Sequence, residues 1–147
     1  MKVHETQIPV PSVYIVSEAE LLANPKYDDW YHKGQLQGCW CCGSFSRGID
    51  RHHIVKPLRS WDIANLALLC RMCHQAAEGC PPTVQIAREP VKWPKLTMSH
   101  VLWLKRERDQ DNYNRHRLEE LYGKRLPRAA RPPEVLLEMR ERRRRAW

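Results

Sequence analysis

The chain has 147 residues, a formal net charge of +8 and six cysteines. This length predicts one domain with appended helices, and the excess of Lys and Arg favours a polyanionic partner. No apolar run approaches the roughly 18 residues that cross a bilayer, and no cationic start is followed by an apolar segment. We therefore expect a cytoplasmic protein with reduced cysteines and no membrane association.

Residues 1–35 are expected to form an N-terminal extension with short helices. Ser17 and Glu20 have the spacing of a capping box, which predicts a helix that starts after Ser17. Asn24-Pro25 predicts the N-cap and first position of a second helix, and Gly34 is its expected end.

Residues 36–80 combine the cysteines and histidines with short apolar runs. The segment 49–55 predicts a strand, and 66–69 predicts a second, buried strand after a loop. Good helix formers over 72–78 predict a helix that begins beside the last cysteine pair. The order is therefore strand, loop, strand and helix, with candidate metal ligands at the joints.

Residues 81–96 contain four prolines and are expected to be an extended connector. Residues 97–147 predict a basic helical region with long helices. The first would run over 97–122, dock at its two apolar ends and be solvated, or lie on a partner, along its charged middle. Gly123 would end it, and a last helix would start at Glu134. The expected class is α+β.

Two Cys-x-x-Cys pairs, Cys39/Cys42 and Cys70/Cys73, have the spacing of structural zinc ligands. Four thiolates suffice for a tetrahedral site, and a reducing compartment favours metal ligation over disulfides. Unligated buried cysteines are the competing interpretation. Cys41 could replace Cys42, but the glycine that follows Cys42 favours Cys42, because it lets the backbone turn tightly round a metal.

Between and after these pairs lie His52, His53, Asn65 and His74. Adjacent residues of a strand point to opposite faces, so one histidine of the pair can bind a metal while the other addresses a different group. His74 directly follows a predicted zinc ligand, so a structural metal would fix its position.

The residues that carry a family resemblance are Cys39-x-x-Cys42, Arg51-His-His-Ile-Val-Lys-Pro57, Asn65-Leu-Ala-Leu-Leu-Cys70 and Cys73-His74. In their order and spacing, residues 36–80 resemble the HNH endonucleases, the ββα-metal nucleases. The resemblance implies a small ββα-metal core with a structural zinc, flanked by the N-terminal short helices and the long C-terminal helices. It also implies hydrolysis of DNA phosphodiester bonds, and by analogy a bacterial or phage-encoded protein.

Carried onto this chain, the resemblance assigns His52 and His74 to a single catalytic divalent cation such as Mg²⁺ or Mn²⁺. His53 becomes the general base and Asn65 the group that orients it, through its side-chain amide or its backbone carbonyl. Many relatives carry another histidine four residues after the last one, where this chain has Glu78. Glu78 is either a third metal ligand, within reach at i+4, or a solvated surface residue.

Contacts to nucleic acid are expected from the basic residues. Within the motif they are Arg47, Arg51, Lys56, Arg59 and Arg71, and at the C-terminus they are Arg142, Arg143, Arg144 and Arg145. The terminal run is either a flexible basic tail or a phosphate contact that adds affinity without sequence information.

Three functions remain in competition at this point. The first is an HNH-type endonuclease acting on DNA, and the second is a catalytically inactive zinc-stabilised module that binds nucleic acid. The third is a protein-interaction module whose C-terminal helices bind a protein partner or a second copy. Metal-dependent cleavage of a plasmid separates the first from the others.

Overall fold

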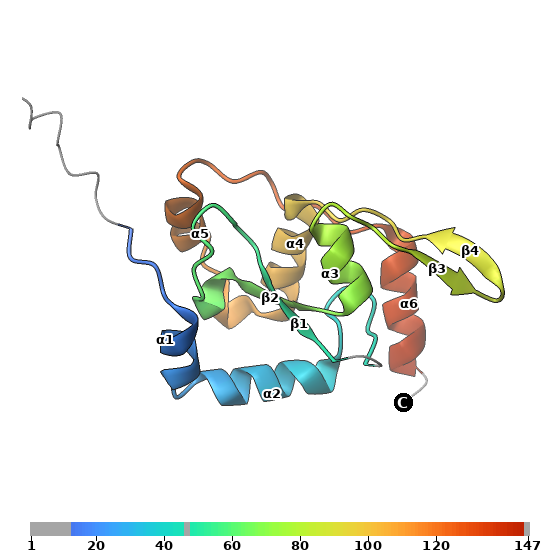
Figure 1. The fold of residues 1–147 in the computed structure, drawn as a ribbon, viewed down its shortest axis with the longest axis horizontal. Coiled ribbons are helices and arrows are strands. Elements are labelled where there is room, and N and C mark those ends of the chain that lie inside the picture. Colours follow the sequence, from blue (N-terminus) through green and yellow to red (C-terminus); the bar gives the residue numbers. More distant parts are fainter. Residues whose placement is uncertain (1–12, 46–47, 146–147) are drawn as a thin grey trace, which may run out of the picture.

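The computed structural model describes residues 13–45 and 48–145, which fold into six α-helices and two small antiparallel sheets (Figure 1). The α+β class is confirmed. None of the helices in these ranges has the length and apolar character that a membrane span requires. The helices are α1 (Glu18–Ala23), α2 (Tyr27–Gln37), α3 (Arg71–Ala77), α4 (Met98–Arg108), α5 (Arg115–Tyr122) and α6 (Glu134–Arg145), and the strands are β1 (Asp50–His53), β2 (Leu66–Leu69), β3 (Thr83–Ile86) and β4 (Glu89–Lys92).

The centre of the molecule is the antiparallel pair β1–β2 followed directly by α3. The register pairs Asp50 with Leu69 and His53 with Leu66. All four residues of β2 are buried, because helices cover the strand on its two sides, as its uninterrupted apolar sequence predicts. The predicted order of strand, loop, strand and helix is confirmed for this segment.

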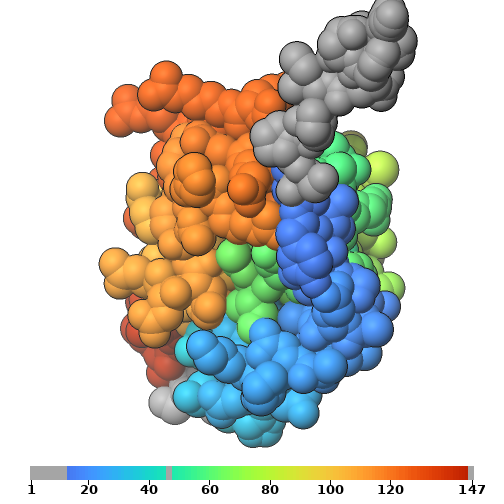
Figure 2. All heavy atoms as spheres, turned by 90° about the vertical axis from the view of Figure 1, so that its left-hand side faces the viewer, coloured from blue at the N-terminus to red at the C-terminus, as the bar shows by residue number. Residues whose placement is uncertain are grey.

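A second, smaller core joins the N-terminal helices to this centre. Leu21 and Tyr27 pack with Leu66, and Trp30 and Trp61 lie against them. In Figure 2 the blue α1–α2 region and the orange α5 region lie on either side of the green segment before β2. The N-terminal extension is therefore part of the folded unit and supports the loop between the strands.

The N-terminal helices agree with the sequence in one case and differ in the other. Ser17 forms the predicted capping box of α1. The second helix starts later than predicted, because the Asn24 side chain accepts a hydrogen bond from the Lys26 backbone N–H at 2.9 Å and closes a turn there. It also continues through Gly34, where a Cβ atom would lie 2.0 Å from Leu68 Cδ1. That glycine serves close packing of α2 on β2, not termination.

Within the connector expected over 81–96, the structure forms the hairpin β3–β4, which the sequence did not predict and which is drawn in yellow at the right of Figure 1. Its two turn residues, Ala87 and Arg88, have φ of 51° and 68°. Such turns usually carry Asn or Gly, so the strongest sequence signal for a hairpin is missing. Pro90 also argued against a strand, but a two-stranded ribbon has only edge strands, where proline is tolerated.

The single helix predicted over 97–122 is wrong, because the chain leaves the helix at Asp109 and makes α4 and α5. The Asp109 carboxylate accepts hydrogen bonds from Trp30 Nε1 at 2.9 Å, Lys105 Nζ at 2.6 Å and Asn112 Nδ2 at 2.8 Å. Lys105, in the stretch expected to be solvated, has no exposed surface. The break is thus fixed by a buried polar network.

The last two predicted boundaries are confirmed. Gly123 ends α5 with φ of 80°, in the left-handed region that glycine adopts without strain. The final helix starts at Glu134 and extends through the arginine run to Arg145. The described part of this run is therefore helical, which fixes the direction of each arginine relative to the others.

Candidate metal centres

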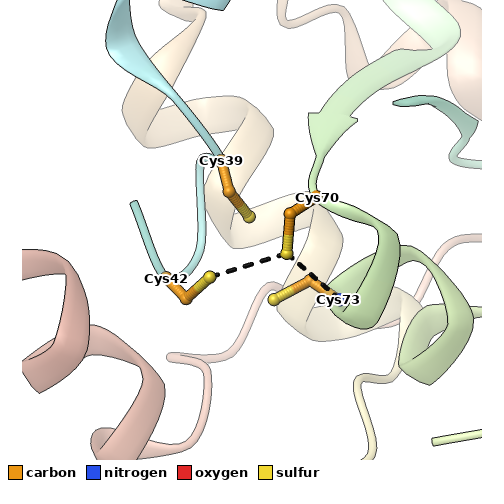
Figure 3. Close-up of side chains that lie close together, drawn as sticks. All are labelled: Cys39, Cys42, Cys70 and Cys73. Atoms are coloured by element: carbon orange, nitrogen blue, oxygen red, sulfur yellow. Dashed lines mark hydrogen bonds between the residues drawn. The ribbon is translucent and has the colours of Figure 1, made fainter. Parts of the chain in front are cut away.

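Four cysteine side chains converge in the interior, as predicted (Figure 3). Their sulfur atoms all lie within 4.8 Å of one another, and Cys42 Sγ is 3.6 Å from Cys70 Sγ. A tetrahedral zinc with bonds of about 2.3 Å places its sulfur ligands about 3.8 Å apart. The donor set and its spacing therefore fit a structural metal ion such as zinc, held by Cys39, Cys42, Cys70 and Cys73.

Local turns aim these thiols at one point. Cys39 donates its backbone N–H to Ser44 O at 3.0 Å, and Gly43 donates to Cys39 O at 2.9 Å, so the first pair lies on a tight loop. Gly43 has φ of 78°, which such a loop requires. Cys70 is the N-cap of α3, and its sulfur accepts the Cys73 N–H at 3.5 Å.

Cys41 lies beside this cluster without belonging to the group of four. A hydrogen bond with Cys73 lowers the pKa of Cys41, but burial and the neighbouring thiols raise it above its ordinary value. The preference for Cys42 as the ligand, drawn from the glycine after it, agrees with this arrangement.

A second cluster lies where β1 meets α3, and it joins His52, His74 and Glu78. His52 Nδ1 is 3.1 Å from Glu78 Oε2, and His74 Nε2 is 3.3 Å from the same oxygen. The two rings meet edge to face with centroids 5.2 Å apart. Two imidazoles and a carboxylate within 4.8 Å form a donor set that could hold a divalent cation.

Electrostatics favour the neutral form of His52 and the charged form of Glu78. Burial and the nearby His74 lower the pKa of His52 to about 3, so its ring is neutral at pH 7. Burial raises the pKa of Glu78, but the hydrogen bond from Lys56 and the nearby histidines lower it below its ordinary value. Lys56 also forms an ion pair with Glu78, which partly neutralises the charge of this carboxylate.

Asp50 was missed in the sequence and belongs to this site. Its Oδ2 lies 2.9 Å from His74 Nδ1 and 3.1 Å from Arg71 Nε. A carboxylate on one ring nitrogen leaves the other nitrogen turned toward a metal, here His74 Nε2 toward Glu78. Strand periodicity is the signal that could have found it, because Asp50 is two residues before His52 and shares its face.

His53 points to the other face of β1, as alternation along a strand predicts. Its ring meets Trp61 edge to face with centroids 4.4 Å apart. Its Nε2 is buried and has no hydrogen-bond partner among the described residues. Burial, then the positive charge of Arg59, lowers the pKa of His53 below its ordinary value. The lowered pKa favours the neutral form of the ring at pH 7.

Asn65 is fully buried and holds the loop between the strands rather than the His53 ring. Its Nδ2 donates to Val55 O at 3.2 Å and to Ser60 O at 2.9 Å, and its Oδ1 accepts from Val55 N at 2.9 Å. Its backbone oxygen accepts from Ile54 N at 2.8 Å. Both the amide and the backbone carbonyl therefore fix the chain on either side of Ile54, directly after His53.

The basic residues predicted within the motif have separate surroundings. Lys56 and Arg71 are held by the carboxylates of the histidine cluster. Arg51 lies over aromatic rings, nearest to that of Trp61, 5.0 Å away. Arg59 has φ of 44° in the exposed loop. Arg47 lies outside the described residues.

A pocket of about 570 Å³ opens beside the histidine cluster. Both faces of β1 contribute to it, with Asp50, His74 and Glu78 on one side and Tyr31, Arg51 and Trp61 on the other. A ligand in this pocket would meet carboxylate and imidazole groups together with a cation and aromatic rings.

Helix α6 braces the loop that carries the first cysteine pair, which the sequence did not reveal. Arg143 donates to Cys42 O at 2.7 Å, and Arg140 donates to Trp40 O at 2.9 Å. Arg140 also pairs with Glu107 at 2.9 Å. Within the terminal run, Arg143 thus supports the fold itself, in addition to the nucleic-acid role predicted for it.

Comparison with protein-family models, curated proteins and solved structures finds no match to this chain. Its chemistry is therefore inferred from the two clusters and the pocket beside them.

Proposed function

We propose that the protein is a metal-dependent endonuclease of the HNH type, which hydrolyses DNA phosphodiester bonds with one catalytic cation and a histidine base. One observation carries the proposal: β1 presents His52 to the cluster with His74 and Glu78, and presents His53 on its other face against Trp61, which lines the pocket beside that cluster. Acid–base and metal-ligating groups thus come from adjacent residues of one short strand.

The thiol cluster serves the stability of this unit. Structural zinc sites supply folding free energy, and here Cys73 lies in the same helix as His74, with Cys70 as its N-cap. The backbone N–H of His74 donates to Cys70 O at 2.8 Å, so the first turn of α3 links the two clusters.

His52 and His74 would hold the catalytic cation, with Glu78 as the third ligand. A bound divalent cation supplies charge stabilisation at the phosphate and the leaving oxygen. A carboxylate among the ligands favours Mg²⁺ or Mn²⁺ over softer ions. Asp50 would hold the ring of His74 in the orientation that turns Nε2 to the metal.

His53 would accept the proton of the attacking water. Its pKa is below the ordinary value, so the ring is deprotonated at neutral pH and ready to act as a base. Trp61 packs on the ring, and Asn65 fixes the backbone that follows it. DNA as substrate is supported by the net charge of +8.

The proposal is tested with supercoiled plasmid, a panel of divalent cations and zinc-loaded protein. Conversion to nicked or linear product with Mg²⁺ or Mn²⁺, and none without a divalent cation, is the expected result. Cleavage that is equally fast without any added cation and in the presence of EDTA would refute the metal-dependent mechanism.

A second function, a zinc-stabilised module that binds nucleic acid without cutting, is favoured by two specific observations. Glu78 already has Lys56 as a partner, and His53 Nε2 is shielded from solvent. Salt-sensitive DNA binding without turnover under any cation would support this second function over the first.

A further inference from the structure

A second pocket, of about 510 Å³, lies away from the histidine cluster, where the end of α2 meets α4, α6 and the loop of the first cysteine pair. Its described lining contains four arginines and no acidic residue: Arg108, Arg140, Arg143 and Arg144. It shares no lining residue with the pocket of the histidine cluster. We call it the arginine pocket.

No carboxylate lines this pocket, although two of its arginines pair with carboxylates outside it: Arg140 with Glu107 at 2.9 Å and Arg144 with Glu141 at 3.4 Å. On the other side of α6 a third pocket is lined by four arginines and four glutamates: Arg131, Arg140, Arg142, Arg145, Glu107, Glu134, Glu138 and Glu141. Arg143 and Arg144 line only the arginine pocket, whereas Arg140 lines both pockets. Burial and the neighbouring Arg140 lower the pKa of Arg108, although Glu107 and Glu141 oppose the shift. With four guanidinium groups and two paired carboxylates, the region keeps an excess of positive charge that would attract an anion.

The remaining walls are apolar. Leu36 is 67% exposed and Phe45 is 41% exposed, and both line the arginine pocket. An aromatic ring and an aliphatic side chain beside several guanidinium groups match the two parts of a nucleotide, a flat base and a phosphate. A phosphate alone would not need the apolar wall.

Helix α2 contributes to both pockets. Tyr31 lines the pocket of the histidine cluster, whereas Gln35, Leu36 and Gln37 line the arginine pocket. Positions 31 and 35 share one face of the helix and are about 6 Å apart along its axis, so one bound strand could reach both pockets.

From these observations we infer that the arginine pocket holds one unpaired nucleotide of the substrate strand, close to the scissile phosphate. Its phosphate lies between Arg108 and Arg144, and its base packs on Phe45 and Leu36. As a statement about substrate this rests on the proposed nuclease function. It makes the preferred substrate DNA with a single-stranded segment next to the cutting site.

Binding without cleavage tests this, using full-length, zinc-loaded protein with no added divalent cation. The probe is a fluorescein-labelled 12-nucleotide single strand, followed by anisotropy over a range of salt concentrations. Arg144→Gln removes a cation from the arginine pocket, and Arg142→Gln removes one from the same helix on the glutamate-lined side. Deleting α6 is avoided, because Arg140 and Arg143 brace the cysteine loop.

We expect Arg144→Gln to weaken binding about tenfold and to reduce the salt slope by about 0.7, the loss of one phosphate contact on a single strand. Arg142→Gln should weaken binding by less than about threefold, because a surface charge that is screened by solvent contributes little to binding. Equal effects of the two variants would overturn the assignment of a phosphate to the arginine pocket.

The base contact is tested by moving an abasic nucleotide through the strand. With the parent protein, the affinity should fall when the abasic nucleotide occupies one particular position. With Phe45→Ala, an abasic nucleotide at that position should leave the affinity unchanged. Two results would overturn the assignment of an unpaired nucleotide to this pocket: an affinity that is the same for every abasic position, or a fully paired duplex that binds as tightly as the single strand. Displacement of the strand by equimolar deoxyadenosine monophosphate would show a site for free nucleotides instead. Binding results of this kind stand whether or not the plasmid is cut, so the two proposals fail separately.

Discussion

The two clusters that meet at α3 differ in burial and in the chemistry of their donor atoms. The four cysteines are at most 1% exposed and offer only sulfur. In the second cluster, the side chains of His74 and Glu78 are 26% and 36% exposed, and the donors are nitrogen and oxygen beside a pocket. A closed thiolate site can only hold a metal, whereas an open mixed site can also admit a substrate.

The surroundings of the two sites differ in the same way. Backbone turns and the arginines of α6 hold the cysteine loop, so that site is fixed by main-chain hydrogen bonds. The histidine cluster is held by side-chain contacts from Asp50 and Lys56. A bound metal or phosphate can replace such side-chain contacts at a small cost in free energy, whereas it cannot replace main-chain hydrogen bonds within a turn. The following substitutions test this division.

The largest effect is expected from Cys73→Ser, which removes one thiolate of the closed site. Zinc binding in such sites contributes on the order of 10 kcal/mol to folding, so the central unit should unfold. Circular dichroism and metal analysis provide the measurement, with one tightly held zinc expected for the parent protein even after mild EDTA treatment. Cys80→Ser, at an exposed cysteine, is the control and should keep its zinc. A Cys73→Ser protein that folds without zinc would show that the zinc has no structural role.

His53→Ala should be next in size and act on chemistry alone. Removing a general base costs about 10²–10⁴ in rate, and His53 is not a ligand in either cluster. Single-turnover plasmid cleavage at saturating protein measures the effect, with zinc content as the check on folding. His116→Ala, at an exposed histidine of α5, is the control. Cleavage within threefold of the parent rate would remove His53 as the base.

Lys105→Met tests the support behind the open site. Lys105 donates to Ile63 O at 2.7 Å and to Leu66 O at 2.9 Å, which flank Asn65. Burial lowers the pKa of Lys105 to about 8, although Asp109 opposes the shift. Loss of the buried amine should lower the free energy of unfolding by about 3 kcal/mol at pH 7, measured by urea denaturation.

The pH dependence gives a second readout for Lys105. Between pH 8 and the ordinary pKa of 10.5, the unfolded chain holds a proton that the folded protein has lost. The contribution of this group to the free energy of unfolding therefore rises with pH in that window, by up to about 1.4 kcal/mol per pH unit. The slope should be smaller in Lys105→Met. Identical slopes in the two proteins would show that the amine does not titrate there.

The smallest effect is expected from Asp50→Asn, which weakens the contact to His74 without removing a proposed ligand. Loss of a carboxylate that orients a metal-binding histidine typically reduces metal affinity about 10–100-fold. Mn²⁺ binding, followed by electron paramagnetic resonance, measures this without cleavage. Zinc content should stay at the parent value, because Asp50 is outside the thiol cluster. Unchanged Mn²⁺ affinity would show that Asp50 does not position His74.

Features that depend on neighbouring residues could be read from the sequence. The capping box at Ser17, the Cys-x-x-Cys pairs, the buried strand 66–69 and the glycine stop at Gly123 all involve residues close along the chain. The opposite directions of His52 and His53 follow from strand periodicity in the same way. Asp50 shared that periodicity and was overlooked.

What only the tertiary structure decided depends on residues that meet across the chain. Asp109 ends α4 because Trp30, 79 positions earlier, donates to its carboxylate. Arg143 supports the cysteine loop across 101 positions. A charged residue in an amphipathic pattern is expected in solvent unless such a partner exists, and the partner is set by the packing of distant elements. The sequence therefore determined which ligands gather on the strand–helix unit, and the fold decided which cations brace it and which face a pocket.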